Sequence, residues 1–277
     1  MHKFSQEPAE TKVDVLGVKV SVTSLQDAAG QVMAAADAGK SFAATALATH
    51  GVMTGVDDPS HEFRLNSLDL VTPDGQPVRW AMNILHGTEL QQRTYGPDLM
   101  REVCLRLSES AGSVALYGST PEVLAKLQVA LAESFAGLRV AFAEPSRFRQ
   151  GTRLEMLELS KRIRASRADV CFVGLGCPRQ EVFVYEIREM LPIPVVAVGA
   201  AFDFLSGSAN EPPKWMQDHG LQWLQRLVLS PRRLGHRYLV LGPRFISLVL
   251  LQLFGRKRLS KKDDRLRRSP PQDLYYL

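Results

Sequence analysis

Short apolar runs alternate along the chain with longer stretches whose apolar positions recur every three or four residues. The runs are rich in small and β-branched side chains, and Gly, Pro or Asp follows most of them, as is typical of buried strands that end in turns. They lie at residues 42–47, 68–75, 112–118, 138–142, 170–173 and 194–198. Strands that alternate with helices over about 200 residues predict an α/β protein with a mostly parallel sheet flanked by helices.

Local signals add a hairpin and several helix boundaries to this Rossmann-like arrangement. Residues 13–22 alternate between apolar and polar around a glycine, which predicts a β-hairpin. Ser24 is expected to cap a helix that ends near residue 38, and Ser119 or Thr120 to cap another. Residues 215–227 predict an aromatic-rich helix that closes the core.

Composition narrows the class of protein. The chain has 277 residues, 45% of them hydrophobic and 23% charged, as in a soluble globular protein of one large or two small domains. Its three cysteines, Cys104, Cys171 and Cys177, are scattered, so neither a disulfide framework nor a zinc site is expected. We expect the protein to work in a reducing compartment. No signal peptide is apparent at the N-terminus, and no metal or cofactor is expected.

Charge is distributed unevenly along the chain. The net charge is +5, yet residues 222–262 hold ten Lys or Arg and no Asp or Glu, whereas acidic residues are in excess before them. The longest apolar run in this basic segment, residues 245–254, is about half the length that crosses a bilayer. We therefore expect an α/β core at 1–221, a basic amphipathic helical appendage at 222–260 and a disordered tail at 261–277.

The basic appendage predicts an anionic partner. A segment of this kind is typical of one that lies on a membrane surface without crossing it. The alternative is a helix that packs on the core and exposes a basic face. In the membrane interpretation, lipid phosphates would be contacted by Arg226, Arg232, Arg233, Arg237 and Arg244. Nucleic acid is disfavoured, because the basic residues alternate with long aliphatics and not with aromatics that would stack on bases.

One strand–turn–helix segment is a candidate anion site. The strand at 170–173 leads into Gly174 and Gly176, which would let a ligand approach the backbone, and then into Arg179 and Gln180 at the start of a helix. Ligands of open α/β sheets bind beyond the carboxyl ends of the strands. An ordinary strand–helix turn could have the same sequence pattern without binding a ligand, because an isolated Gly-x-Gly is a weak signal.

Other strand ends carry candidate catalytic residues. Asp74 follows a strand between Pro73 and Gly75, so its carboxylate could serve as a general base held on a rigid turn. Arg93 precedes a predicted helix and could neutralise a leaving phosphate, or it could pair with a neighbouring carboxylate. His50 could move protons or be a satisfied core histidine. There is no P-loop, complete Gly-x-Gly-x-x-Gly or Asp-x-Asp pair, which disfavours an NAD-linked oxidoreductase.

Taken in order, these pieces resemble the WecG/TagA/CpsF family of glycosyltransferases, glycosyltransferase family 26. The resemblance covers residues 13–245, and its more specific part is Gly-Leu-Gly-Cys-Pro-Arg-Gln-Glu at 174–181 with Phe-Asp-Phe-Leu-Ser-Gly downstream. The other matching segments are Thr-Pro-Asp-Gly at 72–75, Arg-Thr-Tyr-Gly-Pro-Asp-Leu-Met at 93–100, Leu-Tyr-Gly at 116–118, residues 220–227 and Ser-Pro-Arg-Arg-Leu at 230–234.

The resemblance implies an inverting, metal-independent enzyme of bacterial cell-surface polysaccharide synthesis. It would transfer a sugar from a UDP-sugar to a polyprenyl-diphosphate-linked glycan, as a peripheral protein on the cytoplasmic face of the inner membrane; a homo-oligomer is compatible with it. Asp74 would be the catalytic base, Arg93 would stabilise the leaving diphosphate and Gln180 would contact the donor. Further substrate contacts are expected from Thr49, His50, Gly75, Tyr117, Gly118, Gly174, Gly176, Pro178, Arg179, Phe202 and Asp203.

Two departures from the family pattern leave the donated sugar open. Ala46 and Ala48 stand where members often have Thr-x-Asn, so Thr49 or His50 would replace the lost polar contacts. Glu211-Pro-Pro stands where many members have Arg-Ala-Pro. N-acetylmannosamine is therefore not assumed as the donated sugar. The rival interpretation is a non-catalytic, membrane-bound scaffold of a polysaccharide assembly complex.

Overall fold

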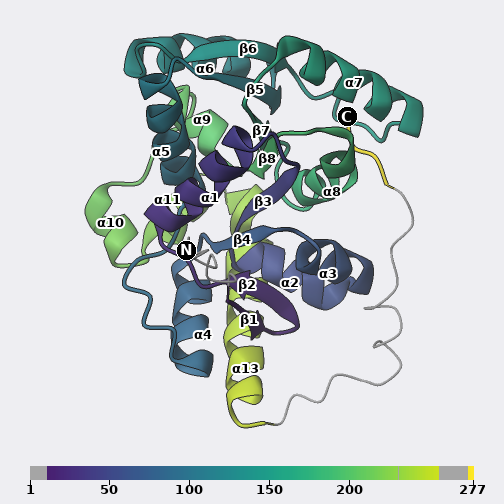
Figure 1. The fold of residues 1–277 in the computed structure, drawn as a ribbon. Helices are drawn as coiled ribbons and strands as arrows, with labels where there is room; N and C mark the ends of the chain where they lie inside the picture. Colours follow the sequence, from purple (N-terminus) through teal and green to yellow (C-terminus); the bar gives the residue numbers. More distant parts are fainter. Residues whose placement is uncertain (1–10, 230, 256–273) are drawn as a thin grey trace, which may run out of the picture.

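A computed structural model describes residues 11–229, 231–255 and 274–277 of the chain. Six strands form one sheet in the order β4-β3-β8-β7-β5-β6, and every neighbouring pair is parallel (Figure 1). The α/β class with a parallel, Rossmann-like sheet is therefore confirmed. The strands are β3 (Phe42–Leu47), β4 (Leu70–Pro73), β5 (Ser113–Gly118), β6 (Arg139–Glu144), β7 (Val170–Gly174) and β8 (Pro194–Ala197).

Helices cover both faces of the sheet and produce two cores. Alternate residues of a strand point to opposite faces, so that Val173 packs in one core and Phe172 in the other. One core is completed by α1 (Leu25–Asp37), α5 (Gly96–Glu109), α6 (Pro121–Ser134) and α9 (Ala201–Leu205). The other core is completed by α2 (Thr49–Asp57), α3 (Pro59–Asn66), α4 (Gln76–His86), α7 (Arg153–Ser166), α8 (Arg179–Ile187) and α13 (Gly242–Leu253).

The predicted local signals are confirmed near the N-terminus. Strands β1 (Lys12–Val15) and β2 (Val18–Ser21) pair as an antiparallel hairpin. The Ser24 side chain accepts a hydrogen bond from the backbone N–H of Asp27 and caps α1, and Thr120 caps α6 in the same way. These boundaries follow from side-chain oxygens that satisfy the free backbone N–H groups of a first helical turn.

The predicted helix at 215–227 is wrong in two respects. It is divided into α10 (Lys214–Asp218) and α11 (Gln222–Leu229) by Gly220, whose φ of +71° favours glycine and ends a helix. Its aromatic residues do not close the core, because Trp215 and Trp223 are 59% and 40% exposed. Only a left-handed turn at Gly220 lets the chain pack on Trp80 of α4 and continue in a new direction.

The last described helix packs on the α/β core. It follows α12 (Pro231–Gly235) and a π-helical turn (His236–Leu241). Phe245 and Val249 of α13 are buried in the core, and the Gln252 carboxamide accepts from the backbone N–H of Leu16 at 2.9 Å. Part of the predicted appendage is therefore anchored, as the alternative of a packed helix with an exposed face requires.

The C-terminal end corrects the predicted tail. Residues 261–273 lie outside the described part of the chain, but the last four residues are placed. Tyr276 forms an antiparallel bridge with Gln150, and Leu277 is buried, with its backbone bonded to that of Arg149. The expectation of a disordered tail is wrong for these four, because Leu277 finds an apolar site beside Gly151. Within the described ranges, no helix combines the length and apolarity needed to cross a membrane.

Candidate functional site

The carboxyl ends of the parallel strands bring the predicted site segments to one edge of the sheet. Leu47 of β3 pairs with Pro73 of β4, and Gly118 of β5 pairs with Gly174 of β7. The loops that follow these strands therefore start side by side. This is the edge at which α/β proteins bind ligands.

Asp74 is held directly after β4. Its backbone N–H donates to the carbonyl oxygen of Leu47 at 3.2 Å, which ties the turn to β3. A Cβ at Gly75 would lie 3.6 Å from the backbone nitrogen of Thr49, so the turn rests against the N-terminus of α2. The Asp74 side chain is 18% exposed. A carboxylate on such a turn is placed rigidly and still reaches solvent.

Arg93 is the charged partner of Asp74. Its Nη1 lies 3.9 Å from Asp74 Oδ1 and donates to the Asp74 carbonyl oxygen at 3.1 Å. The same guanidinium donates to the side-chain oxygens of Gln222 at 2.9 Å and Gln217 at 3.2 Å, and it stacks over the Tyr95 ring at 4.0 Å. Its side chain is only 9% exposed. The cation is therefore fixed in orientation before any ligand arrives.

Gln217 and Gln222 were missed by the sequence analysis. They come from α10 and α11 and are 124 and 129 residues distant from Arg93. No motif marks Gln217, and Gln222 lies in the matching segment 220–227 without an expected role. Their role depends on how the C-terminal helices fold back over the sheet edge. Through Gln222, the start of the predicted appendage contributes to the candidate site.

Gln180 lies in the first turn of α8 and is 2% exposed. Its amide nitrogen donates to Glu181 Oε1 at 2.8 Å, and Thr45 donates to the same oxygen at 3.1 Å. Within the described part of the chain, Gln180 Oε1 has no hydrogen-bond partner. A buried, unsatisfied amide oxygen is costly, so a ligand or water that donates to it would be favoured.

The glycines at the sheet edge have different roles. A Cβ at Gly118 would lie 2.7 Å from the carbonyl oxygen of Gly174, and one at Gly174 would lie 2.7 Å from the Phe202 ring. These two glycines are thus needed for close packing, beyond any ligand contact. Gly176 differs, because its φ is +75° and a Cβ there would meet nothing within 4 Å. It leaves the backbone of the β7–α8 loop open to solvent.

Two predicted substrate contacts have their side chains in the core. The Tyr117 ring stacks on Phe183 with centroids 4.6 Å apart and is 1% exposed, and Phe202 is also 1% exposed. Burial raises the pKa of the Tyr117 phenol. Any ligand contact from these two positions would have to come from the backbone. The remaining predicted contacts are half-buried or exposed, namely Thr49, His50, Pro178, Arg179 and Asp203.

The burial of His50 should make the stability of the protein depend on pH. Burial, with Arg237, His61 and His236 nearby, lowers its pKa to about 4. An unfolded histidine binds a proton below about pH 6.5, so the folded state loses stability as pH falls from 6.5 to 4. We expect His50→Gln to lose less stability than the wild type between pH 7 and pH 5, measured as the urea midpoint. Equal losses would contradict a neutral, desolvated His50.

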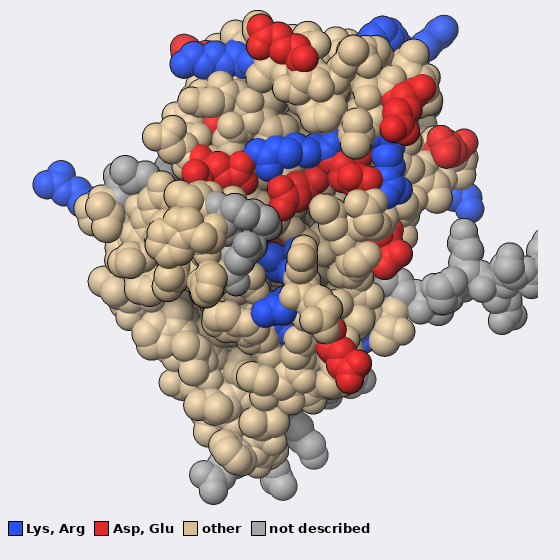
Figure 2. Space-filling view, turned by 90° about the vertical axis from the view of Figure 1, so that its left-hand side faces the viewer, with Lys and Arg blue, Asp and Glu red and all other residues tan. Residues whose placement is uncertain are grey.

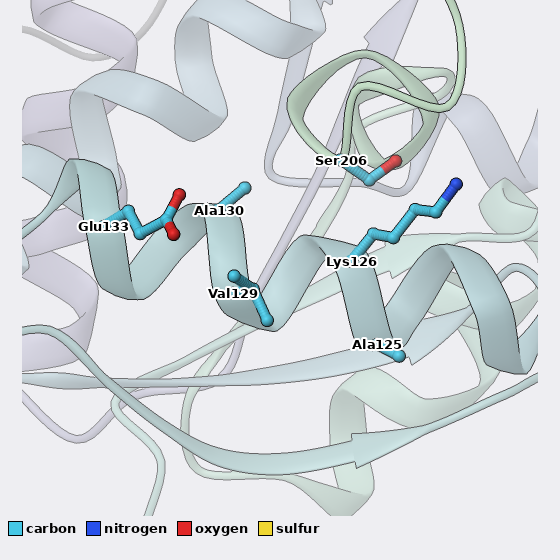
Figure 3. A pocket seen from close by; sticks show the side chains of 6 residues that line it. All are labelled: Ala125, Lys126, Val129, Ala130, Glu133 and Ser206. Carbon is cyan, nitrogen blue, oxygen red and sulfur yellow. The ribbon is translucent and has the colours of Figure 1, made fainter.

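A shallow pocket is lined by a different set of residues. It lies between α6 and the end of α9, and its two charged residues, Lys126 and Glu133, come from the same helix (Figure 3). It is lined by Ala125, Lys126, Val129, Ala130, Glu133 and Ser206. None of the predicted site residues lines it, so it does not compete with the sheet edge as the candidate site.

The C-terminal helices carry much exposed apolar surface. In Figure 2, charged residues form a band across the upper part of the face, whereas most of the lower part, where α4 and α13 lie in Figure 1, is uncharged. Arg232 is exposed, and Arg244 pairs with Asp57 at 2.6 Å. The side chains of Arg226 and Arg233 lie outside the described set. The exposed apolar residues of α4, α10, α11 and α13 include Trp80, Ile84, Trp215, Trp223, Leu224, Val228, Ile246, Leu250 and Phe254.

Comparison with known proteins adds independent findings. The model of the glycosyl transferase WecG/TagA/CpsF family matches residues 13–259. A protein of Bacillus spizizenii named N-acetylglucosaminyldiphosphoundecaprenol N-acetyl-beta-D-mannosaminyltransferase is 30% identical over 70% of this chain and 73% of its own length. A protein of the same name from Bacillus subtilis is 27% identical over 73% of this chain and 76% of its own length.

Proposed function

Because the chain belongs to the WecG/TagA/CpsF glycosyltransferase family, we propose that it transfers a sugar from a UDP-sugar to a polyprenyl-diphosphate-linked acceptor. The reaction inverts the anomeric configuration and uses no catalytic metal ion. The observation that carries this proposal is the pair formed by Asp74 and Arg93, 3.9 Å apart at the carboxyl edge of the sheet. A general base beside a fixed cation suits a displacement with an anionic leaving group.

The proposed displacement has one step. The Asp74 carboxylate takes the proton from an acceptor hydroxyl, whose oxygen attacks the anomeric carbon on the face opposite UDP. The bond from that carbon to the diphosphate oxygen breaks, and UDP leaves with the electron pair. Arg93 and the N-terminal turn of α8 neutralise the charge that develops on the diphosphate. Gln180 Oε1, unsatisfied in the described structure, would accept a hydrogen bond from a donor-sugar hydroxyl.

The names of the relatives suggest the acceptor class. They describe transfer of N-acetylmannosamine to an N-acetylglucosaminyl diphosphoundecaprenol, so we propose a lipid of this class as acceptor, in the synthesis of a cell-surface polysaccharide. The donated sugar is not carried over. Arg101 donates to Glu211 at 2.5 Å, and Ala46 has no polar side chain. Both positions depart from the family pattern, so the relatives' sugar is not assumed for this chain.

We further propose that the C-terminal helices bind the cytoplasmic face of the inner membrane. Exposed Trp and aliphatic side chains would enter the lipid interface while arginines meet anionic head groups. Arg232→Glu is expected to weaken binding to anionic vesicles at least about fivefold, because one basic residue near such a surface is worth about 1 kcal/mol. Vesicle co-sedimentation measures this.

Arg164→Glu is the matched control for that experiment. It reverses the charge of an exposed arginine on α7, outside the C-terminal helices. We expect this variant to bind vesicles nearly as well as the wild type. Equal binding by Arg232→Glu and the wild type would contradict the proposed membrane surface, and DNA binding in a parallel assay would favour a different partner for the basic segment.

The reaction itself is tested by transfer from a panel of radiolabelled UDP-sugars to a bacterial lipid extract. Label that enters the lipid phase for one donor, and does not in Asp74→Asn, would support the enzyme and identify its sugar. If no donor is used although the acceptor extract is native and vesicle binding is intact, the non-catalytic scaffold becomes the better interpretation.

A further inference from the structure

Three potential metal ligands come together where helix α3 approaches the β7–α8 loop and the start of α8. They are His61 of α3, Cys177 of the loop and Glu181 of α8, and their ligand atoms all lie within 4.8 Å of one another. His61 and Glu181 are each only 1% exposed. No zinc site was expected from the sequence. His61 is far from the other two residues along the chain, and Cys177 and Glu181 lie within the family-like segment 174–181.

Two polar atoms of this cluster stand out. His61 Nε2 and Glu181 Oε2 are buried and have no hydrogen-bond partner within the described part of the chain. Glu181 Oε1, in contrast, accepts from both Thr45 and Gln180. One oxygen of the carboxylate is therefore held in place and the other is open. This is the arrangement of a metal-ligating carboxylate with its supporting hydrogen bonds.

The His61 ring is buried, and its Nε2 has no hydrogen-bond partner in the part of the chain that the structure describes. A neutral imidazole offers the lone pair of such a nitrogen to a metal ion. A bound ion would therefore satisfy an atom that the protein itself leaves without a partner.

We propose that His61, Cys177 and Glu181 bind one Zn²⁺ ion as a structural site. A thiolate, an imidazole and a carboxylate form a donor set suited to zinc, and water would complete the tetrahedron. Two ligands of one tetrahedral zinc ion lie about 3.5 Å apart, so small side-chain rotations would close the cluster. The ion would join α3 to the start of α8 and, through Glu181, hold the amide of Gln180. It would be a positioning element and would take no part in the sugar transfer.

A metal-free arrangement is the competing possibility. The Cys177 thiol would then keep its proton and donate a hydrogen bond to the Glu181 carboxylate. Zinc binding instead displaces that proton and makes the thiol a thiolate. The two arrangements differ in bound metal and in the spectrum of a cobalt-substituted protein, neither of which depends on enzymatic activity.

The test uses the full-length protein without a histidine tag. Zinc content is measured by mass spectrometry after zinc supplementation and gel filtration, and Zn²⁺ affinity by competition with a chromophoric chelator. Separately, Co²⁺ is added to chelator-treated protein. We expect about one zinc per chain, submicromolar affinity, a thiolate-to-cobalt charge-transfer band and the intense visible bands of tetrahedral cobalt.

Variants connect the metal to the cluster. Cys177→Ser and Glu181→Gln are expected to lower zinc content and affinity at least tenfold and to weaken the charge-transfer band, while Cys104→Ala, a buried thiol of α5 outside the cluster, should bind like the wild type. Less than about a tenth of an equivalent of zinc in the wild type, with no charge-transfer band, would overturn the site. So would zinc retained equally by Cys177→Ser. The wild-type measurements decide the question even where a variant fails to fold.

Discussion

Replacing Arg93 with alanine is expected to lower kcat by about 10²–10³-fold, at least as much as any other single change at the site. The guanidinium is fixed by three hydrogen bonds, two of them to Gln217 and Gln222, and by stacking on Tyr95. A cation held in this way stabilises a leaving diphosphate without reorganising during the reaction. The measurement is kcat with the donor that the UDP-sugar panel identifies.

Controls separate chemistry from folding at Arg93. Arg106→Ala removes an arginine of α5 that pairs with Glu102 and is expected to leave kcat nearly unchanged. Arg93→Lys keeps the charge but loses the planar fork, so an intermediate kcat is expected. The double change Gln217→Ala and Gln222→Ala releases the C-terminal helices but keeps the cation, and it should cost much less than Arg93→Ala. Near-wild-type turnover in Arg93→Ala would refute its assignment.

Asp74→Asn is the second large effect that we expect, a loss of about 10²-fold in kcat, no greater than that of Arg93→Ala. The change keeps the size of the side chain but removes its ability to accept a proton. The turn should persist, because it is held by the backbone bond to Leu47 and by the contact of Gly75 with the start of α2. Thermal unfolding of the variant should therefore resemble that of the wild type, while transfer to lipid is lost.

The pH profile distinguishes a base from a binding group at Asp74. In the wild type, kcat/KM should fall at low pH as the carboxylate takes a proton, and in Asp74→Asn this acidic limb should disappear. Asp37→Asn, at the exposed end of α1, is the matched control and should keep the wild-type profile. A variant with unchanged kcat and a raised KM would show that Asp74 binds substrate without taking its proton.

Much of the fold could be predicted because its signals are local. The side chains of residues 42–47 favour a strand by themselves. Ser24 begins a helix because its side chain accepts a hydrogen bond from the backbone N–H three residues later. Parallel strands have their carboxyl ends at one edge, so Asp74 and Gly174 could be expected at the same edge of the sheet. How many strands separate them could not, because the order β4-β3-β8-β7 is not the order along the chain. The family was recognised in a different way, from the resemblance of segments such as residues 174–181 to the motifs of its members.

Other features depended on contacts between distant segments. Gln217 and Gln222 both bond Arg93 from different helices, which the left-handed residue Gly220 separates. Gly118 looked like a point of ligand approach, yet the structure shows that the backbone of β7 leaves no room for a side chain there. Trp223 looked like a core residue and is 40% exposed.

The sequence by itself determined the order of strands and helices, the caps and turns, and the positions of Asp74 and Arg93 at strand and helix ends. Each of these results from interactions among residues a few positions apart. Tertiary structure alone decided that two C-terminal glutamines hold Arg93, that Leu277 returns to the core, and that His61 meets Cys177 and Glu181. Such contacts depend on how whole elements pack around a shared core, and local side-chain patterns do not record that packing.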